Sequence, residues 1–213
     1  MFVQAVPSTL KSNLESLGES GVTKKFYLAG GTALALQLGH RVSYDLDFFT
    51  SEEFSQEDLI SKLKELGNLT VDHRAEDTFL GNLNGTKISF FWYRYPLIFP
   101  TVPFLGIALA DIREIGAMKI DAVQSRGKKR DFIDLWAILS HGMGFEELIN
   151  FFQKKYSGVN YNMQHIVSSL AYFSDAENDP MPQMLIKASW EDVKKYIETE
   201  AIKFTRMKSA VNP

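Results

Sequence analysis

The chain has 213 residues, 45% hydrophobic and 23% charged, with a formal net charge of −3 and no cysteine. This composition is ordinary for a soluble globular protein, and the length suits one domain or a catalytic domain with a helical extension. The composition excludes disulfides, thiolate metal sites and a uniformly basic nucleic-acid binder. Because the sequence shows no membrane span and no secretory signal, we expect a cytoplasmic protein that contacts no membrane.

The stretch 26–50 has the pattern strand, glycine turn, helix, loop, strand. Residues 26–29 are apolar and aromatic-rich, which is typical of a buried strand. Gly30 and Gly31 break this strand, and glycine lets the backbone turn sharply or approach a ligand without a Cβ in the way. Thr32 is expected to cap the helix that follows.

The chain then returns as a second strand, in which Asp45 and Asp47 alternate with Leu46 and Phe48. Residues two apart in a strand point to the same face, so the two carboxylates project side by side. Their mutual repulsion is relieved by a cation, and Mg²⁺ prefers oxygen ligands that include phosphate oxygens. An isolated D-x-D is usually a solvent-facing pair, but this one follows a glycine turn and a helix start. We therefore interpret Asp45 and Asp47 as metal ligands beside a phosphate-binding turn.

The run LAGGTALALQLGHR, followed by DLDFF, resembles the signature of the AbiEii/AbiGii toxin family of nucleotidyltransferases, within the polymerase-β-like superfamily. The superfamily pattern G-[GS], helix, D-x-[DE] is matched by the Gly30–Thr32 turn and by Asp45 and Asp47. The resemblance implies Mg²⁺-dependent (or Mn²⁺-dependent) transfer of a nucleoside monophosphate from an NTP to a hydroxyl. It also implies nucleotide contacts from Gly30, Gly31, Thr32, Arg41 and Ser43, whereas the residues alone leave Arg41 open as a surface arginine or as a partner of the acidic pair.

An amphipathic helix over 55–66 and three strands over 69–75, 78–83 and 86–95 are expected next, with Asn84-Gly85 as a hairpin turn. In the superfamily the last of these strands usually carries a third carboxylate, the general base. Here it reads Lys87-Ile88-Ser89-Phe90-Phe91-Trp92, with no acid. The base is therefore unassigned: Asp45, Asp47, a carboxylate from the next segment, or a metal acidifying the hydroxyl are the alternatives. Residues 96–110 are expected to cross irregularly and end in a short strand or turn.

The segment 111–140 carries a run of charged residues on predicted helices. Lys119, Arg126 and Arg130 share one face if the first helix is continuous, although Gly127 can interrupt it. Such a run is usually a salt-bridged, solvated face. However, A-x-K-x-x-A followed by R-G-x-K-R-D-x-x-D resembles the second block of the same family. The resemblance implies that Lys119 contacts the triphosphate, that Lys119 and Asp131 are catalytic, and that the remaining charged residues complete the site. Those residues are Arg126, Lys129, Arg130 and Asp134.

The sequence from residue 145 onward is helical, so we expect a nucleotidyltransferase-like catalytic domain over 1–144 and a helical extension over 145–213. The predicted fold class is α+β, with a small mixed sheet flanked by helices. Helices are expected over 145–156, 162–174 and 190–207, the last capped by Ser189. The basic end of the chain is interpreted as a solvated tail rather than an RNA-binding patch.

The family's toxin role implies a tRNA, another RNA or a protein as acceptor, and an antitoxin as partner. An alternative is a catalytically silent NTP-binding module that regulates a partner, because the third carboxylate is absent. A phosphohydrolase using the same carboxylates is a third hypothesis, and the lack of a His-Asp metal cluster in the sequence argues against its common types.

Overall fold

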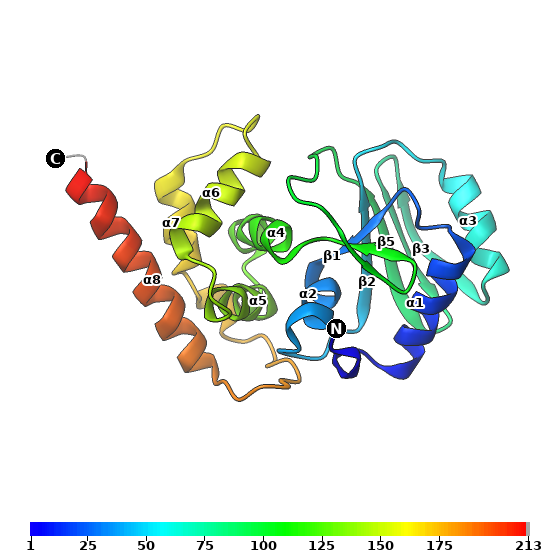
Figure 1. Cartoon of the computed structure of the whole chain (residues 1–213), viewed down its shortest axis with the longest axis horizontal. Coiled ribbons are helices and arrows are strands. Elements are labelled where there is room, and N and C mark those ends of the chain that lie inside the picture. Colours follow the sequence, from blue (N-terminus) through cyan, green and yellow to red (C-terminus); the bar gives the residue numbers. More distant parts are fainter. Residues whose placement is uncertain (212–213) are drawn as a thin grey trace. The chain divides into compact units, whose positions relative to one another are not determined.

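A computed structural model describes residues 1–211 of the chain, which form two compact units, one over Met1–Asp111 and one from Ile112 onward. Figure 1 shows the mixed α+β architecture that the sequence predicts. None of the described helices is long and apolar enough to cross a membrane. The elements of the first unit are a 3-10 helix (Val3–Ala5), α1 (Ser8–Ser20), β1 (Tyr27–Ala29), α2 (Gly30–Leu38), β2 (Asp45–Thr50), α3 (Gln56–Glu65), β3 (Leu69–Ala75), β4 (Thr78–Leu83), β5 (Thr86–Trp92), β6 (Val102–Phe104) and β7 (Ile107–Leu109).

The strands of the described first unit form one seven-stranded mixed sheet in the order β3-β4-β5-β2-β1-β7-β6. The central strand β2 runs antiparallel to β1 and parallel to β5. A parallel neighbour needs a long crossover, and here the chain passes through α3, β3 and β4 before β5 returns beside β2. The strand that carries the D-x-D acids therefore lies in the middle of the sheet, with neighbours on both sides.

The two faces of the central strands differ in burial. Along β2, Leu46 and Phe48 are fully buried and alternate with partly exposed residues, as the sequence predicts. On the buried face Phe48 stacks on Phe90 of β5 with 4.9 Å between ring centroids. Helices α1 and α3 lie together on one side of the sheet in Figure 1, and Asn13 of α1 donates a 2.7 Å hydrogen bond to Thr86 Oγ1. The hydrophobic core of this unit thus lies under these two helices.

Local sequence signals account for most boundaries in this unit. Ser55 caps α3 by accepting a 3.2 Å hydrogen bond from the Asp58 amide. Asn84 and Gly85 form the β4–β5 turn, both with positive φ (49° and 85°), which these residue types tolerate. The prediction for residues 96–110 was incomplete, because this segment ends in a hairpin of two short strands, β6 and β7. Gly106, with φ 75°, supplies the turn between them.

The described part of the second unit is helical. It contains α4 (Ile112–Arg126), α5 (Lys129–Ser140), α6 (Phe145–Lys155), α7 (Met163–Leu170), a 3-10 helix (Ser174–Ala176) and α8 (Trp190–Val211). Helices α4 and α6 pack closely at Gly116, where a Cβ would lie 2.5 Å from Leu148 Cδ1. The helix predicted over 162–174 is shorter than expected, since α7 ends at Leu170 and leaves Phe173 to pack on Phe132 and Trp190.

The compact units divide the chain at Asp111, earlier than the predicted end of the catalytic domain at residue 144. The reason is that α4 and α5 pack with α6, α7 and α8 into one helical core. Compactness does not say which helices the chemistry requires, so the extent of the catalytic domain, 1–144, stays a prediction.

Candidate active site

The glycine pair after β1 makes room for two of the predicted site residues. Gly30 has a left-handed φ of 66°, and a Cβ there would lie 3.1 Å from Asp47 Oδ2. A Cβ on Gly31 would lie 2.2 Å from Nη2 of Arg41. Any side chain at Gly31 therefore has to displace the guanidinium, which is buried and donates a 3.1 Å hydrogen bond from Nη1 to the Val42 carbonyl. Both glycines let α2 begin directly against charged side chains.

Thr32 does not cap α2, contrary to the prediction. The helix already begins at Gly30, with Ala29 as its N-cap, so Thr32 lies in the first turn. Its hydroxyl donates to the Asp45 carbonyl oxygen and shares a 2.8 Å hydrogen bond with the Ser43 hydroxyl. Both side chains are buried. Thr32 and Ser43 thus fix the start of α2 to the start of β2, while the first-turn amides of α2 have no acceptor within the helix.

Asp45 and Asp47 lie side by side on the partly exposed face of β2, as predicted. Asp47 is in register with Ala29, the last residue before the glycine pair. The start of α2 is thereby placed next to the two carboxylates. The positive end of the α2 dipole favours negative charge at this point, whether from carboxylate or from phosphate.

The parallel pairing of β2 with β5 shows what stands where a third carboxylate is expected. Asp45 is in register with Lys87, and Asp47 is in register with Ser89. Lys87 is exposed and Ser89 is partly exposed. The sequence shows that β5 lacks an acid, but it could not identify these two neighbours, because the parallel register depends on the long crossover between the strands.

The donor set on β2 fits a hard divalent cation. Among the described residues, no three His, Cys, Asp or Glu side chains gather into a metal site on their own. Asp45 and Asp47 offer carboxylate oxygens, and Mg²⁺ is commonly held by one or two carboxylates with the rest of its octahedron completed by water and substrate phosphates. The two acids therefore suit a metal that arrives with a phosphate ligand better than an all-protein cage.

In the second unit, the predicted charged residues form a buried ion-pair network. Gly127, with φ 51°, separates α4 from α5, so the helix is not continuous and the predicted common face does not apply. Lys119 Nζ lies 2.7 Å from Asp131 Oδ1 and 2.6 Å from Asp134 Oδ2. All three side chains are almost fully buried. The reversal of the chain at Gly127 brings the two acids of α5 onto the lysine of α4.

Arg126 completes this network from the last residue of α4. It donates two hydrogen bonds to Asp131, from Nε at 2.8 Å and from Nη2 at 2.9 Å, while half of its side chain stays exposed. Burial opposes the ionisation of Asp131, but Lys119 and Arg126 outweigh it and hold the pKa of Asp131 below its usual value. Asp131 is therefore a charged residue that orients two cations.

The neighbouring cations Lys129 and Arg130 differ from each other. Arg130 is exposed. Lys129 is buried, and its ammonium donates to the carbonyl oxygens of Glu177 and Asp179 at 3.0 and 2.5 Å. The Lys129 side chain thus secures the loop before α8, a role that the sequence did not indicate.

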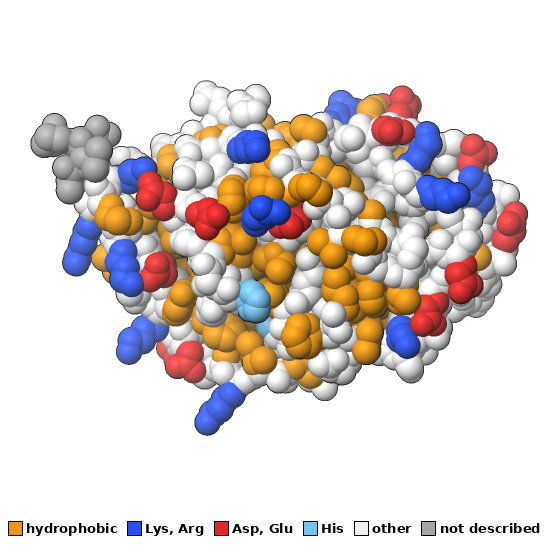
Figure 2. Space-filling model, in the orientation of Figure 1, with side chains coloured by type: hydrophobic (Ala, Val, Ile, Leu, Met, Phe, Trp, Pro, Cys, Tyr) orange, Lys and Arg blue, Asp and Glu red, His pale blue; other side chains and the backbone are white. Residues whose placement is uncertain are grey.

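Figure 2 shows basic and acidic side chains interspersed over α8. Lys203 pairs with Glu200 at 2.6 Å, and Lys208 pairs with Glu146 at 2.8 Å. The basic residues at the end of the described chain therefore lie on a helix with acidic partners beside them, and whether this surface binds RNA stays a prediction.

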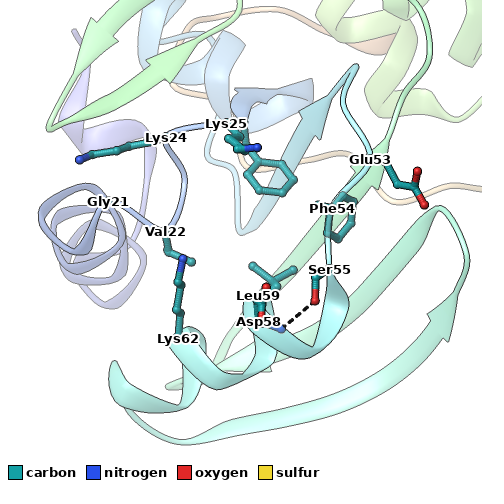
Figure 3. A pocket seen from close by; sticks show the side chains of 11 residues that line it. Gly21, Val22, Lys24, Lys25, Glu53, Phe54, Ser55, Asp58, Leu59 and Lys62 are labelled. Carbon is teal, nitrogen blue, oxygen red and sulfur yellow. Dashed lines mark hydrogen bonds between the residues drawn. The ribbon is translucent and has the colours of Figure 1, made fainter.

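A pocket of about 340 Å³ lies between the α1–β1 loop and the start of α3, as shown in Figure 3. The buried rings and side chains of Phe26 and Leu59 line it, together with Lys24, Lys25 and Lys62. Glu53 and Asp58 also line it, so its charge is mixed. None of the predicted site residues takes part in it, and we do not assign it to the proposed chemistry.

Two comparisons with known proteins identify relatives of this chain over most of its length. A family model described as nucleotidyl transferase AbiEii toxin, type IV toxin–antitoxin system, matches residues 14–104 and 92–206. An uncharacterized protein of Aquifex aeolicus (strain VF5) is 38% identical over 190 residues, covering 87% of this chain and 90% of that protein.

Two solved structures share the fold. One, from H. pylori, is described as a putative nucleotidyltransferase; it is 17% identical, with a TM-score of 0.60 over 96% of this chain and 98% of its own. The other is MenT4, a nucleotidyltransferase toxin from Mycobacterium tuberculosis H37Rv; it is 14% identical, with a TM-score of 0.54 over 91% of this chain and 85% of its own. Because the family model matches residues in both units, the chain belongs to the AbiEii family of nucleotidyltransferase toxins.

Proposed function

We propose that this chain transfers a nucleoside monophosphate from an NTP to a hydroxyl of a tRNA, another RNA or a protein. As a member of a toxin family it would act as the toxin of a toxin–antitoxin pair, with an antitoxin protein as partner. One observation carries the chemistry. Asp45 and Asp47 stand side by side on a central strand, next to the N-terminus of a helix whose first two residues are glycines.

The residues of the first unit would bind the metal and the phosphates. Asp45 and Asp47 would hold Mg²⁺ or Mn²⁺, which neutralises the triphosphate and organises an in-line displacement when bound. The backbone amides of Gly30, Gly31 and Thr32 would donate to phosphate oxygens at the positive end of α2. Arg41 lies against Gly31 and would add a cation to this side of the site.

The residues of the second unit would stabilise the leaving group. Arg126 suits this role, because Asp131 fixes its guanidinium through two hydrogen bonds while half of the side chain stays exposed. Arg130 is exposed and is proposed as a further phosphate contact. Lys119 is held by two buried acids, so it would need to exchange one of them for phosphate in order to contact the triphosphate.

In the reaction, the acceptor oxygen forms a bond to the α-phosphorus while the bond from that phosphorus to the bridging oxygen breaks. Pyrophosphate leaves, and the hydroxyl proton passes to a base. Lys87 and Ser89 occupy the register positions beside the two acids, so β5 offers no carboxylate for this task. We propose that the carboxylate of Asp45 or Asp47 accepts the proton.

The same observation on β5 favours a second candidate function. A chain that holds an NTP without a dedicated base could be a catalytically silent module that regulates a partner protein. It would bind an NTP and release no pyrophosphate. The two functions therefore differ in one measurable quantity, the formation of pyrophosphate.

The test is incubation of the purified protein with Mg²⁺, total tRNA and each of the four NTPs, radiolabelled at the α-phosphate. Asp47→Asn is run in parallel, with Asp72→Asn as the matched control because Asp72 is an exposed acid of β3. We expect label on RNA or on protein with one preferred NTP, full transfer by Asp72→Asn, and loss of at least about 100-fold in Asp47→Asn.

Full activity of Asp47→Asn would contradict the assignment of the metal site. NTP binding without label or pyrophosphate would favour the silent module. If no NTP binds, Asp45 and Asp47 are a solvent-facing acidic pair and not metal ligands.

A further inference from the structure

Aromatic side chains continue the carboxylate-bearing face of the sheet beyond Asp47. We call the set of Tyr27, Phe49, Phe91, Tyr93 and Tyr95 the aromatic row. Phe49 stacks on Tyr27 with 5.9 Å between ring centroids and on Phe91 with 5.1 Å. Tyr93 packs edge-to-face on Phe49 at 5.4 Å, and Tyr95 packs on Tyr93 at 5.1 Å. The rings form a continuous surface from β1 across β2 to β5 and the segment after it.

Strand geometry places the aromatic row on the same face as the acids. Phe49 follows Asp47 by two residues, which corresponds to about 7 Å along a strand with both side chains on one face. Tyr27 and Phe91 are the register partners of Phe49 on the two neighbouring strands. The row therefore begins directly beside the carboxylate pair.

Core packing accounts for only part of this face of the sheet, because Tyr27, at the β1 end of the row, is buried. On the opposite face, Phe48 and Phe90 also stack, and both are fully buried. Phe49, Phe91, Tyr93 and Tyr95 stay partly exposed. Flat rings held partly in solvent next to a reaction centre are a binding surface for a planar ligand.

The position of the aromatic row relative to the glycine turn indicates which reactant it faces. Since β1 is antiparallel to β2 and Ala29 is opposite Asp47, the chain continues through Gly30 alongside the Asp45 end of β2. The proposed triphosphate site therefore lies at the Asp45 end, and the aromatic row lies beyond Asp47. In an in-line displacement the attacking oxygen and the leaving group are on opposite sides of the phosphorus. The row is thus on the acceptor side.

Stacked rings of this kind suit the bases of a single-stranded nucleic acid, because every base has a π-face and stacking on aromatic side chains tolerates any sequence. The cations of this segment lie elsewhere. Lys87 is in register with Asp45, at the end assigned to the triphosphate, and Arg94 stacks on Trp92, which alternates with Phe91 and therefore points to the opposite face.

We propose that the aromatic row is the acceptor subsite and stacks an unpaired base of a single-stranded nucleic acid. This inference rests on the proposed transferase function and adds the class of acceptor and the residues that hold it. Phe49, Phe91 and Tyr93 make the stacking surface.

The experiment measures binding without catalysis. The anisotropy of a short, fluorescein-labelled single-stranded RNA of mixed sequence is titrated with the full-length protein in the absence of NTP. Tyr93→Leu and Phe91→Leu keep apolar volume but remove a flat ring, and each should weaken RNA binding by about 5- to 150-fold. Phe91→Tyr keeps the ring and should bind like the wild type. Tyr172→Leu is the control, because Tyr172 is an exposed tyrosine outside the row.

A second measurement, the thermal shift given by each NTP with Mg²⁺, should be unchanged in all variants that fold. If Tyr93→Leu and Phe91→Leu bind RNA as tightly as the wild type, the inference is wrong, whatever the transfer assay shows. Loss of NTP binding instead of RNA binding would reassign the row to the base of the NTP. Label transferred to a protein, with no RNA binding by the wild type, would reassign it to a protein acceptor.

If RNA binding depends on the rings but the protein transfers no label, the proposed function is wrong and the proposed RNA-binding surface is retained. The two failures are therefore distinguishable.

Discussion

At the scale of single residues, the active-site candidates are packed against one another more tightly than a surface motif requires. Gly31 leaves space for Arg41 Nη2, and Gly30 leaves space for the carboxylate of Asp47. Thr32 bonds to Ser43 and to the backbone of Asp45, and so fixes the loop that carries Arg41. The backbone turn therefore requires glycine at position 30, where φ is 66°, and the guanidinium of Arg41 requires it at position 31.

Gly31→Ala should therefore lower both transfer and stability. The methyl group displaces the guanidinium of Arg41, and a misplacement of about 1 Å in a catalytic site can cost about 100-fold in rate. We expect a loss of this size in kcat/KM, and a cost of about 1–3 kcal/mol in unfolding free energy from overpacking. Gly158→Ala is the control, since nothing lies within 4 Å of a Cβ at that position. Wild-type kcat/KM in Gly31→Ala would contradict the role of Arg41.

The lowered pKa of Asp131 predicts a pH dependence of stability. A carboxyl with a lowered folded-state pKa contributes stability that is complete above its unfolded value, about pH 4, and is lost as the pH falls through the folded value. Asp131→Asn should therefore be less stable than the wild type by about 1–3 kcal/mol at pH 7.

This difference should shrink as the pH falls below about 4. Urea unfolding at a series of pH values measures it, with Asp72→Asn as the exposed control. A difference between Asp131→Asn and the wild type that does not change with pH would contradict the assignment of the shift to Asp131.

At the scale of elements, α4 is joined to α6 by a fully buried ion pair between Glu114 and Lys155. Burial lowers the pKa of Lys155, although Glu114 beside it acts in the opposite direction. The charge of this lysine is therefore costly in the core, and the pair specifies how the two helices pack more than it stabilises them.

Lys155→Met alone should destabilise the protein by about 3–5 kcal/mol, because it leaves the charge of Glu114 buried without its lysine. The double variant Glu114→Leu/Lys155→Met should recover most of this loss, since replacing both partners with apolar groups is often neutral. Urea unfolding of the two single variants and the double variant gives the coupling free energy. Strictly additive losses would show that the two residues act independently.

At the scale of the whole molecule, the family match extends over both compact units, although the acids of β2 lie in one and the Lys119 network lies in the other. The proposed chemistry assigns the metal and the glycine turn to the first unit and the orienting acid with its two cations to the second. Each unit by itself therefore carries only part of the proposed residues.

Binding of the preferred NTP with Mg²⁺ should stabilise the whole chain. At 100 times the Kd, the linkage term is about 2.7 kcal/mol, which for a protein of this size raises Tm by about 5–10 °C. EDTA should remove most of the shift, and Asp47→Asn should show little of it, because the metal ligand is lost. An equal shift in Asp47→Asn and in the wild type would contradict metal-dependent NTP binding at this site.

The sequence by itself determined the parts of this protein that depend on local physics. The alternation of Asp45, Leu46, Asp47 and Phe48 correctly predicted which side chains face the core, since strand period is a local property. Asn84 and Gly85 likewise predicted the turn between β4 and β5. The AbiEii family was recognisable from two short blocks.

Tertiary structure alone decided the long-range arrangement. The register of β5 against β2 placed Lys87 and Ser89 beside the acids and built the aromatic row, because residues far apart in sequence pair only after the crossover has folded. The chain reversal at Gly127 turned a predicted basic face into a buried network around Asp131. These contacts depend on packing between distant segments, for which no local pattern exists.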